Sequence, residues 1–200
     1  MKELIVFAGP NGSGKSTITS QFLDPVFHNA YVNADEIQSS LDLTEYEAAM
    51  KAQEAREQLL AQRCNFAFES VMSTPVNIDL LIRAKWQGYN ITCYYVLTSD
   101  PQINISRVAA RVSMGGHDVP PNTIYLRYIR ALTLLPILFS ICNTVYVFDN
   151  SHDVVEQKAH PIVYCENRTV NTYPTDIWSS EMIQSLIAGK YPTDYILNTP

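Results

Sequence analysis

The chain has 200 residues and a mass of 22.6 kDa, which fits one domain that can bury its own hydrophobic core. Its formal net charge of −6 argues against general attraction to nucleic acid or to an anionic membrane, so we expect neither as a partner. Glycine is scarce, and five of the seven glycines lie in two clusters, at residues 9–14 and 115–116. We therefore look for function at these two clusters.

Short apolar runs alternate with helical patterns through the first 150 residues. The apolar runs predict strands at 4–8, 30–33, 65–68, 91–97 and 145–148. The helical patterns, two of which start near a proline, predict helices at 15–22, 46–63, 75–87, 103–112 and 122–139. Five such alternations predict an α/β fold with a mainly parallel five-stranded sheet between two layers of helices.

Beyond this core the pattern changes. Residues 160–170 suit one more strand, and residues 180–188 suit a short helix that ends at Gly189. We interpret the whole chain as a single domain with its core at 1–151. Residues 152–200 form an extension without an assigned role, and covering the edge of the sheet is the simplest interpretation of it.

Two sequence features bear on where in the cell the protein resides. Residues 131–148 contain no charged side chain and must be weighed as a membrane span, but Pro136 and Asn143 interrupt them, and a buried helix end followed by a strand explains them better. The four cysteines are widely separated and show no metal-ligand spacing, and no secretion signal precedes them. They predict reduced thiols and a cytoplasmic protein.

The first glycine cluster satisfies the P-loop motif G-x-x-x-x-G-K-[ST] and lies between a predicted strand and a predicted helix. Glycines let successive backbone N–H groups turn toward a phosphate, and the start of the helix adds partial positive charge. Lys15 would contact the β- and γ-phosphates of ATP, and the Ser16 hydroxyl would coordinate Mg²⁺. The predicted nucleotide site comprises Gly9, Pro10, Asn11, Gly12, Ser13, Gly14, Lys15, Ser16 and Thr17.

A P-loop alone does not distinguish kinases from GTPases, motors and transporter ATPases. The chain has no LSGGQ-like segment, which an ABC-type ATPase should carry, and no NKxD motif, with which a Ras-like GTPase binds the base. A small kinase remains, and a kinase also needs an acceptor site, a base and a cationic lid.

Acidic residues follow predicted strands at the edge of the sheet where the P-loop lies and where ligands of parallel sheets bind. Asp35 is the candidate base that accepts the proton of an incoming hydroxyl, with a helix N-cap as the alternative. Glu69 would orient a water on Mg²⁺ or hold the acceptor, with a polar strand end as the alternative. We assign Asp149, together with Asn150 and Ser151, to a turn that touches the adenine.

The second glycine cluster lies among arginines. Arg107 and Arg111 are four residues apart and share a helix face, and the glycines at 115–116 would hinge the loop that follows. In an acidic chain this local excess of arginine indicates a lid over the triphosphate, where guanidinium groups neutralise charge during transfer. A solvated helix face with ordinary surface arginines is the alternative.

We predict the acceptor site at the same edge of the sheet as the P-loop. His117 would contact phosphate or the acceptor, or it would serve only the structure of its loop. Arg127 and Arg130 add two cations on one face of the next predicted helix. The predicted acceptor site comprises Asp35, Glu69, Ser70, His117, Arg127 and Arg130.

These segments resemble the zeta-toxin-like P-loop kinases. The resemblance rests on the P-loop, on Val-Asn-Ala-Asp-Glu-Ile at 32–37, on Phe-Glu-Ser at 68–70 and on the Gly-Gly-His-Asp-Val-Pro core of 107–120, in the family's order. It covers about residues 3–151 and implies the kinase-like three-layer fold of P-loop NTPases.

The resemblance also implies roles for single residues. Asp35 matches the family's catalytic base, Lys15 and Ser16 match its nucleotide and metal ligands, and Arg111 matches a transition-state arginine. Zeta toxins transfer the γ-phosphoryl of ATP to a ring hydroxyl of a UDP-N-acetyl amino sugar with Mg²⁺, so an ATP-dependent small-molecule kinase is expected, with an antitoxin-like protein as a further partner.

The chain also departs from the family's pattern. The segment at 70–75 offers no cation, although a UDP diphosphate would favour one, and the chain is closer to a branch whose substrate is not established, so toxicity is not implied. Another acceptor, such as a nucleoside or an antibiotic hydroxyl, is the second enzymatic interpretation. The alternative from another class is a nucleotide-binding regulatory module that acts through a protein partner with little or no kinase activity.

Overall fold

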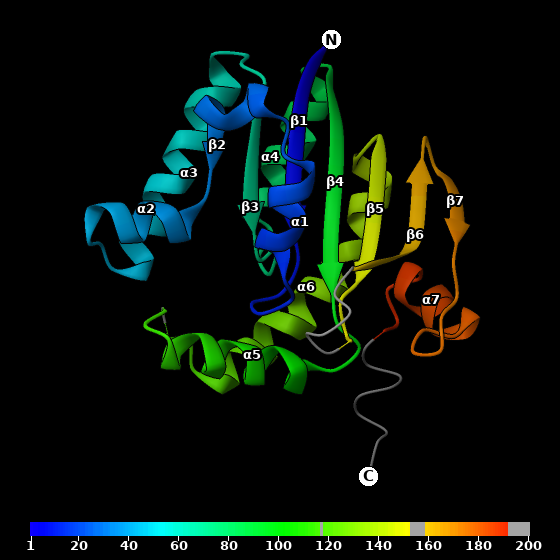
Figure 1. The fold of residues 1–200 in the computed structure, drawn as a ribbon. Coiled ribbons are helices and arrows are strands. Elements are labelled where there is room, and N and C mark those ends of the chain that lie inside the picture. Colours follow the sequence, from blue (N-terminus) through cyan, green and yellow to red (C-terminus); the bar gives the residue numbers. More distant parts are fainter. Residues whose placement is uncertain (117, 153–158, 192–200) are drawn as a thin grey trace.

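The structure is a computed structural model, and it describes residues 1–116, 118–152 and 159–191. Its strands are β1 (Lys2–Ala8), β2 (Tyr31–Val32), β3 (Phe66–Ser70), β4 (Tyr89–Leu97), β5 (Thr144–Asp149), β6 (His160–Glu166) and β7 (Thr169–Thr172). They form one sheet with the order β2-β3-β1-β4-β5-β6-β7 (Figure 1). The neighbours from β2 to β5 are parallel, and the last two pairs are antiparallel.

The prediction of a five-stranded sheet is wrong in the number of strands, which is seven among the described residues. Residues 160–170 do not form one strand but most of the hairpin β6–β7, which extends the sheet beyond β5. Its turn residues, Asn167 and Arg168, have φ of 48° and 69°. Two left-handed residues suit the twist of a hairpin, but the turn lacks the glycine that usually marks it in a sequence.

The helices follow the predicted alternation with additions. The helix predicted at 15–22 is present with these bounds, and those predicted at 46–63, 75–87, 103–112 and 122–139 are present with shifted ends, whereas α2 was not predicted. The helical elements are α1 (Lys15–Phe22), η1 (Pro25–Ala30), α2 (Ala34–Leu41), α3 (Glu45–Ala61), α4 (Val76–Trp86), α5 (Pro101–Ser113), α6 (Pro121–Ile141) and α7 (Ser180–Ile187).

Helices cover both faces of the sheet, which confirms the three-layer prediction. Side chains alternate across β1, so that Leu4 and Val6 join a large core cluster with residues of α3, α4 and α6, whereas Phe7 joins a smaller cluster with Ile18 of α1. In Figure 1, α1 lies in front of β1 while α4 and α6 lie behind the sheet. The sheet is therefore the middle layer.

Helix α6 is long and apolar enough, by length and composition, to cross a membrane. Most of its buried residues pack in the large core cluster, and the hydroxyl of Tyr128 donates to the carbonyl oxygen of Thr98 at 2.6 Å. This bond ties α6 to the end of β4. The uncharged stretch at 131–148 thus divides into the end of α6 and the strand β5, as the sequence predicts.

The parallel strands end at one edge of the sheet, and α5 lies across this edge (Figure 1). Asp100 caps α5 by accepting a hydrogen bond from the N–H of Gln102 at 2.7 Å, and Pro101 occupies the first helical position. Helix α3 begins with a capping box formed by Thr44 and Glu47. These caps fix where α3 and α5 begin, and both helices contribute side chains to the site described next.

Candidate active site

The P-loop joins β1 to α1 and lies very close to its neighbours. Gly9 has φ of 139°, and a Cβ there would lie 2.0 Å from the backbone oxygen of Val96. Gly14 has φ of 94°, and a Cβ there would lie 2.2 Å from Nδ2 of Asn150. Gly9 cannot carry a side chain, because a Cβ would overlap backbone atoms. At Gly14 the positive φ favours glycine, and a Cβ would displace the amide of Asn150.

Two asparagines hold the P-loop from outside. Asn104 of α5 donates from Nδ2 to the carbonyl oxygen of Asn11 at 2.6 Å, and Asn150 donates from Nδ2 to the carbonyl oxygen of Ser13 at 2.8 Å. Asn104 is buried, and its Oδ1 accepts a hydrogen bond from the hydroxyl of Thr98. These bonds preorganise the loop, so that its backbone N–H groups need little rearrangement to bind a phosphate.

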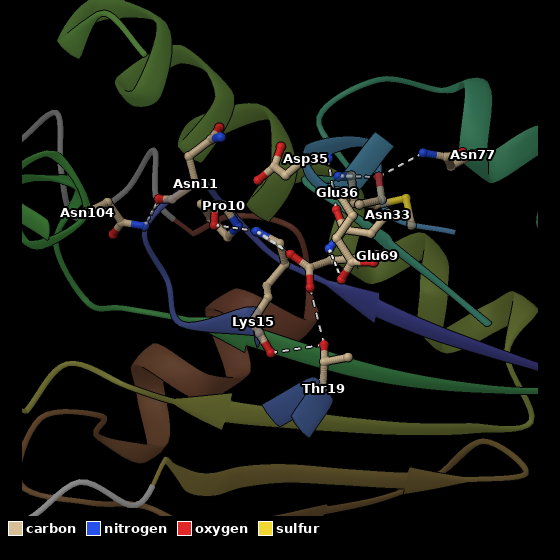
Figure 2. A network of polar contacts seen from close by, with 12 residues as sticks. Pro10, Asn11, Lys15, Thr19, Asn33, Asp35, Glu36, Glu69, Asn77 and Asn104 are labelled. Carbon is tan, nitrogen blue, oxygen red and sulfur yellow. Dashed lines mark hydrogen bonds and ion pairs between the residues drawn. The ribbon is translucent and has the colours of Figure 1, made fainter. Parts of the chain in front are cut away.

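Lys15 is the first residue of α1 and is buried, with 8% of its surface exposed. Its ammonium donates to the carbonyl oxygen of Pro10 at 3.1 Å and lies 3.9 Å from Oε1 of Glu69 (Figure 2). Burial lowers the pKa of Lys15, and the negative charges of Glu69 and Asp35 oppose this decrease. A partly desolvated ammonium interacts strongly with any phosphate that enters the site.

Glu69, near the end of β3, connects Lys15 to a network of hydroxyl groups. Its Oε2 accepts hydrogen bonds from Thr19 at 3.2 Å and from Tyr31 at 3.3 Å. Burial and the charge of Glu69 raise the pKa of Tyr31 well above its usual range, so the phenol stays protonated and donates. The buried carboxylate is thereby held in one orientation beside the P-loop.

Asp35 lies in the first turn of α2, which follows β2. The N-cap of this helix is Asn33, whose Oδ1 accepts a hydrogen bond from the backbone N–H of Asp35 at 3.0 Å. The alternative that Asp35 itself is the cap is therefore wrong. Figure 2 shows Asp35 reaching from α2 toward the P-loop, on the same side as Lys15 and Glu69.

A cavity of about 320 Å³, the first cavity, lies over the P-loop and is lined by parts of α1, α2 and α5. Three P-loop residues that precede the lysine, Asn11, Gly12 and Gly14, line it as well. Among the predicted nucleotide-site residues, Gly9, Pro10, Ser13 and Thr17 do not line it. The other predicted site residues that this cavity brings together are Lys15, Ser16, Asp35, Glu69, Ser70, Arg107 and Arg111.

A second cavity, of about 400 Å³, adjoins the first. It extends between α2, α3, α6 and the segment after β3, and Arg127 and Arg130 of α6 line it, as predicted for the acceptor side. Asp35 and Glu69 line both cavities. Two compartments that share a pair of carboxylates are what a transfer between two bound molecules requires.

The two arginines predicted for the lid differ in their surroundings. Arg107 lines the first cavity, but its guanidinium donates to the carbonyl oxygens of Asn150 at 2.7 Å and His152 at 2.9 Å, so part of its hydrogen-bonding capacity holds the loop after β5. Arg111, one turn further along α5, lines the same cavity and is close enough to Lys15 to lower its pKa.

Asp149 was predicted to belong to a turn that touches the adenine. Asp149 is fully buried and does not line either cavity; its Oδ1 accepts hydrogen bonds from the backbone N–H of Ser151 at 3.1 Å and from the Ser151 hydroxyl. The carboxylate of Asp149 thus orders the loop after β5, and a contact with adenine stays a prediction. His117 lies outside the described residues.

The donor set beside Lys15 fits Mg²⁺. The described residues contain no group of three or more His, Cys, Asp or Glu that could enclose a metal ion. Mg²⁺ commonly keeps several waters and is bound by one or two protein oxygens together with substrate phosphates. Ser16 and Glu69, which line the same cavity, present a hydroxyl and a carboxylate of this kind.

Four residues that hold or line the site are not among the predicted site residues: Asn104, Thr19, Tyr31 and Arg56. Two of them leave a signal in the sequence. Asn104 shares a buried helix face with Val108, one turn further on. Arg56 is the charged member of a series at intervals of four, and a charged or amide side chain in such an otherwise apolar series indicates a buried polar role. The buried residues of α3 are Ala48, Ala52, Arg56 and Leu60.

The fold and the P-loop define the class of the protein: a P-loop NTPase of the kinase type, that is, a P-loop phosphotransferase. The zeta toxin family model matches residues 1–176, so the chain belongs to the zeta toxin family. The chain is also 30% identical over 129 residues to an uncharacterized protein of Haemophilus influenzae, an alignment that covers 62% of this chain and 91% of that protein.

Solved structures share the fold. A chain of the AvrRxo1-ORF1:AvrRxo1-ORF2 complex with sulphate ions superposes with a TM-score of 0.72 at 13% identity, over 95% of this chain but only 65% of that one. A chain of the PezAT toxin–antitoxin system of Streptococcus pneumoniae superposes with a TM-score of 0.59 at 16% identity, over 100% of this chain and 88% of that one. A third structure, AvrRxo1-ORF1:-ORF2 with ATP, gives a TM-score of 0.71. At these low sequence identities, the structural similarity shows a shared fold and no more.

Proposed function

We propose that the protein is an ATP-dependent kinase that transfers the γ-phosphoryl group to a hydroxyl of a small molecule. The observation that carries the proposal is that Asp35 and Glu69 stand at the boundary between two adjoining cavities, one over the P-loop and one beyond it. The first cavity would hold ATP and the second the acceptor. An ATP-binding module that acts only through a partner has no need of the second compartment.

Each residue then has a role in the transfer. The P-loop N–H groups and Lys15 bind the β- and γ-phosphates, and Arg111 neutralises charge that develops on the transferred group. Asp35 accepts the proton as the acceptor oxygen bonds to the γ-phosphorus, while the bond from that phosphorus to the β,γ-bridging oxygen breaks and ADP leaves. Ser16 and Glu69 would hold Mg²⁺, which neutralises phosphate charge when bound.

The nature of the acceptor and of a partner follows from the family. The acceptor we propose first is the UDP-N-acetyl amino sugar that zeta toxins phosphorylate, and a protein of the antitoxin type is the partner we propose. The PezAT structure comes from a toxin–antitoxin system, which supports such a partner for a chain of this fold. The described cysteines are all free, which supports the proposal of a cytoplasmic location.

The test is Asp35→Asn, assayed with ATP, Mg²⁺ and a panel of hydroxyl compounds that includes nucleotide sugars, nucleosides and aminoglycosides. Acceptor-dependent ADP formation should fall by about 100-fold or more, because the amide cannot accept the proton. The affinity for ATP, measured by calorimetry, should stay within about twofold, since the P-loop is unchanged.

Asp42→Asn is the matched control, because Asp42 ends the same helix and is absent from the lining of both cavities. Full turnover in Asp35→Asn would remove Asp35 from its role. ATP binding without turnover on any acceptor in the wild-type chain would favour the regulatory module instead.

A further inference from the structure

Arg56 stands out in the second cavity. It projects from α3, lines that cavity and is buried, with 7% of its surface exposed. Its guanidinium lies over the ring of Phe68, 5.3 Å from the centroid, and it forms no hydrogen bond or ion pair with the described residues. Its Nε atom is fully buried without a partner.

The buried guanidinium of Arg56 needs a negatively charged partner. Burial lowers the pKa of Arg56 to about 10, yet the group stays protonated at neutral pH. The face of Phe68 attracts the positive charge but cannot accept the hydrogen bonds that a guanidinium offers. A buried charge without hydrogen bonds is costly, and such groups in proteins are generally paired. The partner is therefore expected to come from a molecule in the cavity.

The nearby charges do not supply this partner. Glu57, whose negative charge acts on Arg56, forms an ion pair with Arg83. Glu45 is paired with Arg127, whose NH2 lies 2.7 Å from Oε1, and Asp35 and Glu69 lie on the side shared with the first cavity. Arg130 adds a second cation to the lining. Apart from the two carboxylates shared with the first cavity, the lining thus carries more guanidinium groups than carboxylates.

Neutral polar groups of the same cavity are also unpaired. Oδ1 of Asn77 and Oδ1 of Asn11 are buried acceptors without a donor, and both residues line the second cavity. Asn77 is oriented by its own amide, which donates to the hydroxyl of Ser70 at 2.8 Å (Figure 2). Unpaired acceptors beside an unpaired cation suit a ligand that carries both hydroxyl groups and a negative charge.

On the basis of the proposed function, we infer that the acceptor is an anion and that Arg56 binds its phosphate or carboxylate group, so that Arg56 determines which hydroxyl compounds are phosphorylated. The segment at 70–75, directly after Glu69, carries no cation, and α3 contributes Arg56 to the same cavity. The guanidinium plane can hold either kind of oxyanion through two parallel hydrogen bonds.

The binding experiment does not depend on turnover. The first cavity is saturated with Mg²⁺ and the non-hydrolysable analogue AMP-PNP, and the melting temperature of the full chain is followed while inorganic phosphate or malonate is added at constant ionic strength. A saturable rise with phosphate indicates a phosphate-bearing acceptor, and one with malonate a carboxylate-bearing acceptor. Arg56→Gln should weaken this binding about tenfold or more, the loss expected for hydrogen bonds between charged groups.

Two variants separate binding from folding. Arg56→Lys keeps a cation and should recover part of the anion affinity, which a purely structural side chain would not do. Lys51→Gln removes a positive charge from the exposed side of the same helix. It should leave the rise in melting temperature with phosphate or malonate unchanged. Equal anion affinity in Arg56→Gln and the wild-type chain, or no anion binding at all, would overturn the inference.

The kinetic experiment links the site to transfer. Pairs of acceptors that differ only in an anionic group, such as a sugar and its phosphate, are compared in the wild-type chain. The anionic member should be preferred, and Arg56→Gln should raise its KM about tenfold with little change in kcat or in the KM for ATP. An unchanged KM for the anionic acceptor in Arg56→Gln, or transfer to the neutral member of the pair alone, contradicts the inference but leaves the kinase proposal intact. Anion binding at Arg56 without any transfer contradicts only the kinase proposal.

Discussion

Gly9 shows how little space surrounds the P-loop. The backbone oxygen of Val96 would lie 2.0 Å from a Cβ at this position, and β4 cannot move away without breaking its pairing with β1. Gly9→Ala should therefore lower the free energy of unfolding by about 2–4 kcal/mol, combining overlap with backbone strain. Urea titration followed by circular dichroism measures this loss.

Gly88→Ala is the control for strain alone. Gly88 has φ of 80°, but a Cβ there would meet no atom within 4 Å. Gly88→Ala should lower the free energy of unfolding by about 1 kcal/mol, because only the left-handed backbone disfavours alanine. Equal losses in the two variants would show that the close approach at Gly9 does not matter.

At the residue scale, the sequence predicts the reactive centre better than its surroundings. Lys15 and Glu69 can be identified because a P-loop and a carboxylate at a strand end follow local patterns. Arg56 lies among charged and polar neighbours, in Lys-Ala-Gln-Glu-Ala-Arg-Glu at 51–57, which resembles an exposed helix. Its place at intervals of four with buried residues of α3 indicates burial, but its contact with Phe68, a residue of another element, does not follow from a local pattern.

At the scale of elements, α2 links the fold to the proposed chemistry. Asn33 caps this short helix and holds the backbone of Asp35, while its Nδ2 donates to the hydroxyl of Tyr31 at 3.2 Å. Asn33→Ala should destabilise the protein by about 1 kcal/mol, the usual value of an N-cap. It should also lower kcat for transfer, because Asp35 loses its position, while the affinity for ATP is maintained.

Urea titration measures the loss of stability in Asn33→Ala, and steady-state kinetics measures the decrease in kcat. Asn33→Asp preserves the cap and is the control, since aspartate caps helices as well as asparagine does. If Asn33→Ala were destabilised but turned over at the wild-type rate, α2 would be a structural element only.

The elements that the sequence did not predict have different causes. Helix α2 is only eight residues long and none of its residues is buried, so its few apolar positions give a weak helical signal. The β6–β7 turn uses Asn167 and Arg168 in left-handed conformations, which the pairing of the two strands stabilises without a glycine. The strands from β1 to β5 could be predicted, because buried parallel strands have continuous apolar sequences.

At the scale of the whole molecule, the described part of the C-terminal extension, residues 159–191, contributes side chains to the core. Strand β6 pairs with β5, and Trp178, which is fully buried, packs against Tyr191 with ring centroids 5.1 Å apart. The hydroxyl of Tyr191 donates to the carbonyl oxygen of Ser99, just after β4, at 2.8 Å. We propose on this basis that residues 1–200 form a single domain, in which the extension supports the edge that carries the site.

The central claim is that this molecule moves phosphate from ATP to a small hydroxyl compound. The most direct test is mass spectrometry of a metabolite extract incubated with the protein, Mg²⁺ and ATP labelled with ¹⁸O in the γ-phosphate. We predict a new compound that carries one labelled phosphate group, present with the wild-type chain and Asp42→Asn but absent with Asp35→Asn. Labelled inorganic phosphate as the sole product, or the same labelled compound from Asp35→Asn, would contradict the account.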